Sequence, residues 1–267
     1  MSATEKQRVQ EQFGDKAAAY AASAVHAKGG SLQRLLHLTA PQKEWAVLDV
    51  ATGAGHTAHI FAPHVRHVVA SDLTMPMVDR ARMLAQELGR LNVTSVAADG
   101  ERLPFAAGSF DLLTCRLAAH HFSDVVAFVC EAARVLRPGG LLAVSDNVVP
   151  GSARSGKKAR LQQAAGRYVN AFEKLRDPSH VRHQTVSEWR QHYYDCGFAL
   201  QHEESAKKAI DFSEYVARSG VAPDDIVRLR AMLVQAPELV LEFLTPIFQG
   251  DTITFHLTEA IFIGQLQ

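Results

Sequence analysis

The first 150 residues alternate between short apolar runs and segments whose apolar residues recur with helical spacing. The short runs predict buried strands, and the longer periodic segments predict helices. Such alternation with short connections is typical of a parallel sheet with helices on both faces, and right-handed crossovers make the sheet doubly wound. The expected strands are residues 45–51, 67–72, 93–98, 110–115 and 141–147, and the expected helices are 57–63, 75–88 and 125–136.

The second half of the chain is organised differently. Two more strands are expected at 198–210 and 252–264, and the later one suits an antiparallel insertion into the sheet. Helical segments at 1–40, 151–185 and 212–248 have no place inside the sheet, so we expect them to cap its carboxyl edge, where ligands bind in such folds.

These expectations combine into one α/β domain spanning residues 1–267. Its core is a doubly wound, mostly parallel, seven-stranded sheet of Rossmann-like type whose last strand is antiparallel, with a helical cap. The expected parts are an N-terminal helical lid at 1–40, a ligand-binding core at 41–150, and cap helices with the last two strands at 151–267.

Composition disfavours several classes of protein. The chain has 28 Lys and Arg against 28 Asp and Glu, and this zero formal charge argues against nucleic-acid binding. No apolar run is long enough to cross a bilayer, and the polar N-terminus does not resemble a secretory signal, so we expect a cytoplasmic protein. Cys115, Cys130 and Cys196 are widely spaced, so we expect reduced thiols, no disulfide framework and no metal site.

A glycine-rich turn follows the first expected strand. Gly53 and Gly55 belong to a Gly-x-Gly-x-x-Ala pattern, which fits the dinucleotide-binding fingerprint and lets backbone N–H groups approach a ligand closely. Asp49 lies on the strand just before this turn. A buried carboxylate there needs backbone amides or a cationic ligand to offset its desolvation, and it would repel a dinucleotide pyrophosphate.

Two more carboxylates follow the next strands. Asp72 ends the second strand, where a carboxylate can accept both hydroxyls of a ribose, and Asp99 follows the third, where it could accept from an adenine amino group. Together with Asp49 and the glycine turn, they describe a pocket for an adenosine that carries a positive group and no phosphate, as in S-adenosylmethionine (SAM). The alternative, in which all three carboxylates are ordinary strand-end caps, requires a threefold coincidence.

The ordered motifs resemble those of class I SAM-dependent methyltransferases, in particular the ubiquinone/menaquinone C-methyltransferase-like branch. The motifs that carry the resemblance are DVATGAG at 49–55, DLTxxM at 72–77, DGERLPF at 99–105, FD at 110–111 and RVLRPGG at 134–140. The chain departs from the pattern at Ala51, where many members have a third glycine. The flank FGDKAAAY at 13–20 resembles the N-terminal lid of the family, and RDPSHVR at 176–182, followed by SEW at 187–189, resembles a small bacterial subgroup.

The resemblance implies SAM as the cofactor and assigns residues to it. The implied contacts are Ala51, Gly53 and Gly55 at the methionine end, with Asp49 just before them; Asp72 at the ribose; Leu73 and Met77 beside the adenine; Asp99 and Gly100 at the adenine edge; Arg116 or Leu117 beside the sulfonium; and Tyr20 closing over the cofactor.

The acceptor side is less defined. Methyl transfer from a sulfonium is an in-line displacement, and a base is needed only if the acceptor must lose a proton. His120 and His121 follow the fourth strand and are the candidate catalytic residues, although this pair could instead shape the loop. His180 and Arg182, in the expected cap, could bind an anionic or hydroxylated acceptor, or could simply begin a helix.

The sequence therefore predicts a SAM-dependent methyltransferase acting on a small-molecule acceptor. The alternatives are an NAD(P)-dependent oxidoreductase, which Asp49 disfavours, and a non-catalytic SAM-binding protein. The identity of the acceptor, the methylated atom and the oligomeric state do not follow from the residues.

Overall fold

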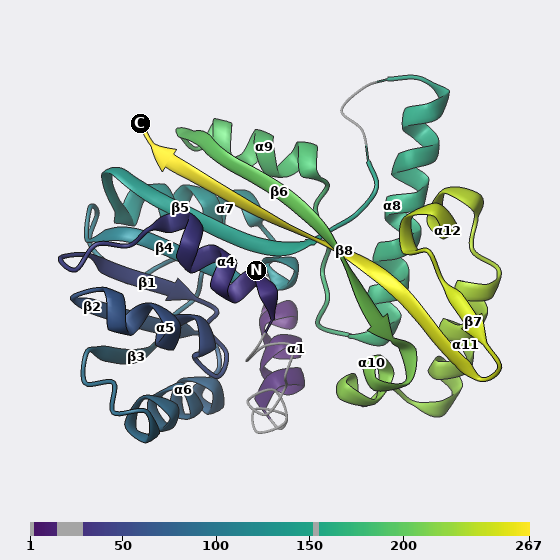
Figure 1. Ribbon diagram of the computed structural model, residues 1–267, viewed down its shortest axis with the longest axis horizontal. Coiled ribbons are helices and arrows are strands. Elements are labelled where there is room, and N and C mark those ends of the chain that lie inside the picture. The colour runs from purple at the N-terminus through teal and green to yellow at the C-terminus, as the bar shows by residue number, and fades with distance from the viewer. Residues whose placement is uncertain (1–2, 15–28, 152–154) are drawn as a thin grey trace.

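The computed structural model describes residues 3–14, 29–151 and 155–267, and all structural statements below refer to these residues. Tyr20 lies outside this range, so its expected contact with the cofactor stays a prediction. Two lobes are visible in Figure 1, a sheet with helices on both faces and a smaller, mainly helical lobe. The long strands β6 (Phe198–Asp211) and β8 (Thr252–Leu266) run through both lobes.

One sheet carries the fold, with the strand order β3-β2-β1-β4-β5-β8-β6. The first five strands are parallel, whereas β8 is antiparallel to both of its neighbours, β5 and β6. These five strands are β1 (Ala46–Val50), β2 (His67–Asp72), β3 (Val93–Ala97), β4 (Phe110–Arg116) and β5 (Leu136–Val148). The doubly wound α/β sheet with an inserted antiparallel last strand is thereby confirmed.

The sheet contains an eighth strand that the sequence analysis did not identify. The three residues of β7 (Ile247–Gln249) form a hairpin with the start of β8. A strand this short shows too few alternations to be recognised from its sequence.

Alternating side chains of the buried strands build the two faces of the sheet. On β1, Leu48 and Val50 face a core shared with α7 and α9, whereas Val47 faces a second core shared with α4 and α5. This period of two explains why every residue of β1 is buried. The helices of this lobe are α4 (Gly30–Thr39), α5 (His56–Phe61), α6 (Met75–Glu87), α7 (Val125–Val135) and α9 (Val186–Asp195), with 3-10 turns η1 (Ala62–His64) and η2 (Ala119–His121).

The second lobe contains the helices expected in the cap at 151–185 and 212–248, whereas α4, from the segment 1–40 also expected there, packs on the sheet core through Leu35. Its helices pack on the outer half of β8 around a separate apolar core that includes Phe172, Tyr215, Leu233 and Phe255. The cap consists of α8 (Lys157–Arg176), α10 (Phe212–Ser219), α11 (Pro223–Val234), α12 (Glu238–Leu244) and β7. Pro223 begins α11 and Pro237 is the N-cap of α12, which explains the breaks expected at these prolines.

One element boundary differs from the expectation. The Arg-Pro-Gly-Gly segment lies inside β5, which begins at Leu136 directly after α7, rather than closing the helix before a strand that starts at 141. The register of β4 with β5 shifts at this point, and Gly139 adopts a φ of +77° there. Arg137 pairs with Asp111 at 2.6 Å and so holds the irregular start of β5 against β4.

The expectation of three reduced thiols is wrong for two of them. Cys130 on α7 and Cys196 after α9 form a disulfide, and Cys115 is the remaining, buried thiol. The two cysteines are 66 residues apart in sequence, but α7 and α9 pack side by side on one face of the sheet. Spacing in the sequence carries no information about such a contact.

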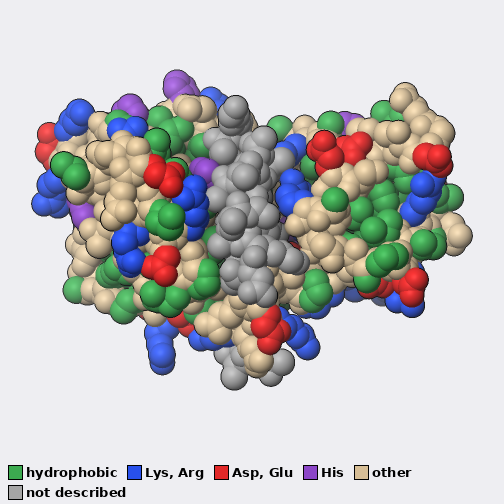
Figure 2. Space-filling model, turned by 90° about the horizontal axis from the view of Figure 1, so that it is seen from below, with side chains coloured by type: hydrophobic (Ala, Val, Ile, Leu, Met, Phe, Trp, Pro, Cys, Tyr) green, Lys and Arg blue, Asp and Glu red, His purple; other side chains and the backbone are tan. Residues whose placement is uncertain are grey.

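The distribution of charge on the surface and the apolarity of the helices agree with the balanced charge and the short apolar runs of the sequence. Positive and negative side chains are interspersed over the face seen in Figure 2. Within the described ranges, no helix has the length and apolarity needed to span a membrane.

Candidate active site

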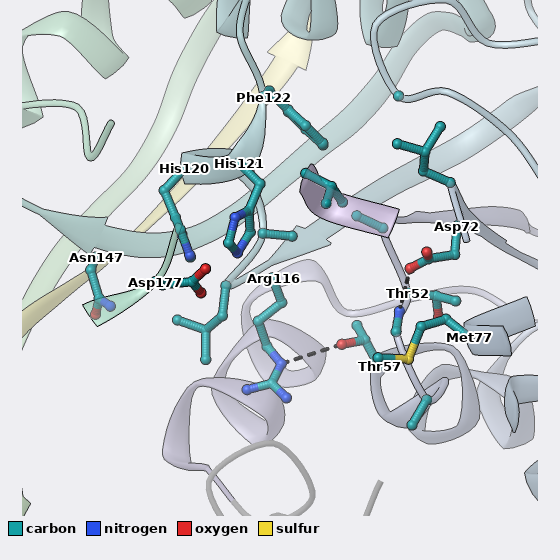
Figure 3. Close-up of a pocket in the computed structure, with 18 of the residues that line it drawn as sticks. Thr52, Thr57, Asp72, Met77, Arg116, His120, His121, Phe122, Asn147 and Asp177 are labelled. Carbon is teal, nitrogen blue, oxygen red and sulfur yellow. Dashed lines mark hydrogen bonds between the residues drawn. The ribbon is translucent and has the colours of Figure 1, made fainter. Parts of the chain in front are cut away.

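A cavity lies at the carboxyl edge of the sheet, between the sheet lobe and the cap (Figure 3). Residues that follow β1, β2, β3 and β4 line one side of it, and residues of β6, α8 and α10 line the other. The carboxyl ends of parallel strands meet at one edge of a sheet, so segments far apart in sequence converge here.

The glycine loop, residues 51–55, connects β1 to α5. Gly53 and Gly55 adopt φ values of +55° and +92°, which favour glycine. A Cβ atom on Gly55 would lie 2.8 Å from the His59 ring and 3.1 Å from the Ala81 Cβ, so this position has no room for a side chain. Glycine there allows α5 to begin directly behind the cavity.

Asp49 supports the glycine loop from beneath. Its carboxylate accepts hydrogen bonds from the hydroxyls of Thr52 (2.5 Å) and Thr114 (2.6 Å) and from the backbone N–H of Ala58 (3.2 Å). Burial nevertheless raises the pKa of Asp49 to about 6. The donors that offset its desolvation are therefore protein groups, and Asp49 shapes the loop rather than lining the cavity.

Asp72 reaches the cavity and also holds the loop. Its Oδ2 accepts from the backbone N–H of Gly53 at 2.9 Å, and its Oδ1 accepts from the N–H and hydroxyl of Thr74, both at 2.9 Å. Burial raises the pKa of Asp72 in spite of these bonds. Leu73 and Met77 also line the cavity, and their contact with an adenine stays a prediction.

Asp99 and Gly100 line the same part of the cavity, below the N-terminal helix α1 (Ala3–Gly14). Lys6 of this helix pairs with Asp99 Oδ2, and Val9 lines the cavity. A Cβ atom on Gly100 would lie 2.9 Å from Val50 and 3.1 Å from the Phe122 ring. Asp99 thus has a cationic partner, Lys6, in this structure. A ligand amino group would have to share Asp99 with Lys6 or replace Lys6.

Two non-glycine residues at the cavity have a left-handed backbone. Ala51 (φ +52°) follows β1, and Leu117 (φ +53°) follows β4. The other two described cases, Ala40 and Thr245, are ordinary helix C-caps. Strained backbone of this kind persists where the surrounding structure enforces it, and it concentrates at ligand sites.

Arg116 brings a buried positive charge to the cavity. It extends from the end of β4, and its guanidinium donates to the hydroxyls of Thr57 at 3.3 Å and Ser31 at 3.4 Å. Burial lowers the pKa of this side chain. A cation so placed next to the glycine loop is suited to a carboxylate of a ligand.

Four imidazoles, the histidine cluster, meet on the other side of the cavity. His120 lies with ring centroids 4.2 Å from His121, 4.7 Å from His183 and 5.5 Å from His180. The Nδ1 atom of His120 lies 2.7 Å from Asp146 Oδ1. Burial opposes protonation of His120, but the negative charge of Asp146 outweighs it and raises the pKa of His120. Burial and the neighbouring His120 lower the pKa of His121 to about 4.

A model of the methyltransferase domain family matches residues 48–144. The methyltransferase YcgJ of Bacillus subtilis is 36% identical over 212 residues, which covers 79% of this chain and 80% of YcgJ. The chain belongs to the SAM-dependent methyltransferase family.

Solved structures agree with this assignment. The crystal structure of YcgJ superposes with a TM-score of 0.82 at 33% identity, covering 89% of this chain and 98% of YcgJ. A putative methyltransferase from Bacillus halodurans gives the same TM-score at 32% identity, covering 89% and 99%. Demethylmenaquinone methyltransferase of Deinococcus radiodurans is 38% identical over 118 residues, 43% of this chain and 48% of that enzyme. The oxidoreductase alternative has no support among these relatives.

SAM is the cofactor of this methyltransferase, and the residues present fit it. The glycine loop leaves room for close approach by a ligand, and Asp72 presents a buried carboxylate at the cavity. The described residues expected to contact SAM, apart from Asp49 and Gly55, line this one cavity.

The acceptor side of the methyltransferase differs more from the expectations. His180 is buried behind the cavity with its Nε2 atom 2.9 Å from Asn170, and Arg182 pairs with Glu188 outside it. Residues that the sequence analysis missed line the cavity instead, namely Asn147, Lys208, Tyr215 and Arg218. Asn147 lies on β5, Lys208 on β6, and Tyr215 and Arg218 on α10. Nothing in the local pattern of these elements marked them, because their meeting depends on how the cap folds over the sheet.

Proposed function

We propose that this methyltransferase transfers the methyl group of SAM to a small-molecule acceptor bound between the glycine loop and the cap. The observation that supports this is a cavity whose two sides differ in chemistry. The sheet side carries the residues suited to SAM, and the cap side carries Asn147, Lys208, Tyr215 and Arg218. Bound SAM supplies an activated methyl group, so the protein must chiefly position the acceptor and exclude water.

The sheet side would bind the cofactor as follows. Asp72 accepts the ribose hydroxyls, Leu73 and Met77 pack on the adenine, and Asp99 with Gly100 contacts its edge. Arg116 binds the methionine carboxylate, because a guanidinium placed beside the sulfonium would repel it. The lid helix α1, which contributes Val9, covers this half.

The cap side favours an acceptor with a negative or strongly polar group. Lys208 and Arg218 bring positive charge to the cavity, and Lys208 also forms an ion pair with Glu259 at 4.0 Å. The guanidinium of Arg218 lies 5.4 Å from the ring centre of Tyr215. An anionic acceptor is therefore drawn to the end of the cavity opposite the adenine pocket.

Activation of the acceptor is assigned to the histidine cluster. His120 and His121 line the cavity, and Asp146 holds the His120 ring. Their catalytic role is to remove the acceptor proton that methylation displaces.

Two measurements on the full chain test the proposal. Calorimetric titration with SAM, S-adenosylhomocysteine and NADH is expected to show micromolar binding of the first two and none of NADH. Release of S-adenosylhomocysteine is then followed with panels of phenols, enols, amines and carboxylates. Binding of NADH alone would contradict the cofactor, and SAM binding without turnover of any acceptor would favour the non-catalytic alternative.

A further inference from the structure

Three potential metal ligands converge on the acceptor side of the cavity. His120 belongs to η2, Asp146 to β5, and His183 to the segment between α8 and α9. One ligand atom from each lies within 4.8 Å of the other two. The three residues are 8%, 2% and 2% exposed, so the grouping is not a chance contact of mobile surface side chains.

His183 is a buried imidazole for which the described residues provide no side-chain hydrogen bond. Both of its ring nitrogens are buried, and neither has a hydrogen-bond partner among the described residues. Its backbone N–H donates to Asn170, so the segment itself is held in place. A buried polar atom without a partner is costly, and an imidazole with two of them calls for a bound water or ion.

We propose that His120, Asp146 and His183 bind a divalent transition-metal ion. Two imidazoles and a carboxylate form a ligand set preferred by zinc, iron and related ions. Tetrahedral bonds of about 2.1 Å place such ligand atoms roughly 3.4 Å apart. The three ligand atoms, which lie within 4.8 Å of one another, would draw together around the ion. His120 Nδ1 and Asp146 Oδ1 are 2.7 Å apart in a hydrogen bond, and an ion bound between them would take the place of the shared proton.

Asp177 is a less suitable ligand although it lies beside the cluster. Its Oδ1 accepts from both the N–H and the hydroxyl of Ser179, which commits it to the local turn. His121 contacts Ser179 at 3.2 Å through Nδ1. His180, whose Nε2 contacts Asn170, has only a partnerless Nδ1, whereas both ring nitrogens of His183 lack a partner among the described residues.

The proposed ion would face the acceptor. His120 and His183 both line the cavity, so coordination positions not filled by protein are open to a ligand there. An acceptor oxygen bound to the ion loses its proton more readily, and that proton passes to solvent. The inference rests on the proposed function and specifies that acceptors with an ionisable oxygen are activated through the ion.

Cobalt provides a direct test, because its visible absorption reports nitrogen and oxygen ligands. The chelator-treated full chain is titrated with Co²⁺, followed by calorimetry and absorption. We expect one Co²⁺ per chain with new visible bands. His183→Ala and Asp146→Asn should each weaken binding by roughly 10- to 100-fold, whereas His64→Ala, at an exposed histidine, should not.

SAM titration of the same proteins separates the two proposals. Retained SAM affinity in His183→Ala shows that the variant is folded and its cofactor site intact. If wild-type protein binds SAM but no Co²⁺, or if His183→Ala binds Co²⁺ like His64→Ala, the metal site is overturned and the proposed function stands. If the wild-type protein does not bind SAM, the proposed function is contradicted instead.

Discussion

The carboxylate of Asp72 accepts a hydrogen bond from the backbone N–H of Gly53 at 2.9 Å, and this contact ties the end of β2 to the loop after β1. The second carboxylate oxygen is held by Thr74. Asp72 is therefore oriented before any ligand arrives, which reduces the ordering that ligand binding requires.

Replacing Asp72 with Asn tests its assignment to the ribose. Loss of the charge should weaken SAM binding by about 1.5–3 kcal/mol, because charge-assisted hydrogen bonds become neutral ones. Calorimetric titration measures this change. Asp79→Asn, at an exposed position of α6, is the matched control and should bind SAM like the wild type. Equal affinity in a folded Asp72→Asn protein would remove the ribose assignment.

Asp49 should make stability depend on pH in a specific direction. Burial raises its pKa to about 6 in the folded protein, above the unfolded value. The ionised carboxyl thus destabilises the ligand-free fold above pH 6, and this cost fades as the pH falls towards the unfolded pKa near 4.

Asp49→Asn isolates this effect, since an amide can still accept from Ala58 and donate to the Thr114 hydroxyl. The variant should be more stable than the wild type by about 1–3 kcal/mol at pH 8 and equal to it near pH 4. Urea unfolding at both pH values gives the difference. A difference that does not change with pH would show that Asp49 is not ionised at pH 8 or is not destabilised by burial.

The disulfide should add stability under oxidising conditions. Cys130–Cys196 closes a long loop, and removing such a link typically costs about 2–4 kcal/mol. Cys196→Ser should lose this amount and become insensitive to dithiothreitol. Cys115→Ala, which leaves the link intact, should retain the sensitivity. Urea unfolding with and without reductant decides the matter, and identical wild-type curves would contradict the structural role of the bond.

Ala51 should tolerate glycine, unlike an alanine within a helix. Its φ of +52° costs an L-residue about 1–2 kcal/mol, which exceeds the entropy that glycine loses on folding. Ala51→Gly should therefore be neutral or more stable by up to about 1 kcal/mol. Ala40→Gly, at the left-handed C-cap of α4, should behave alike, whereas Ala127→Gly inside α7 should lose about 1 kcal/mol. If thermal unfolding shows that Ala51→Gly loses as much stability as Ala127→Gly, the backbone at Ala51 is not strained.

The cofactor half of the site could be predicted because its residues follow successive strands. Gly53, Asp72 and Asp99 lie at or just after the carboxyl ends of β1, β2 and β3, and a parallel sheet brings all such positions to one edge. The chain's periodicity also indicated the cap and the antiparallel last strand. Local pattern was insufficient at β7, which is too short, and at the irregular start of β5.

What the sequence determined by itself is thus the sheet, its order of elements and the residues at its carboxyl edge, because these depend on spacing along the chain. Only the tertiary structure decided which cap residues complete the cavity, that Cys130 meets Cys196, and that His183 joins His120 and Asp146. These contacts arise from the packing of α7, α8, α9 and the cap against the sheet. Such packing joins residues distant in sequence, and hydrophobic periodicity does not encode which of them meet.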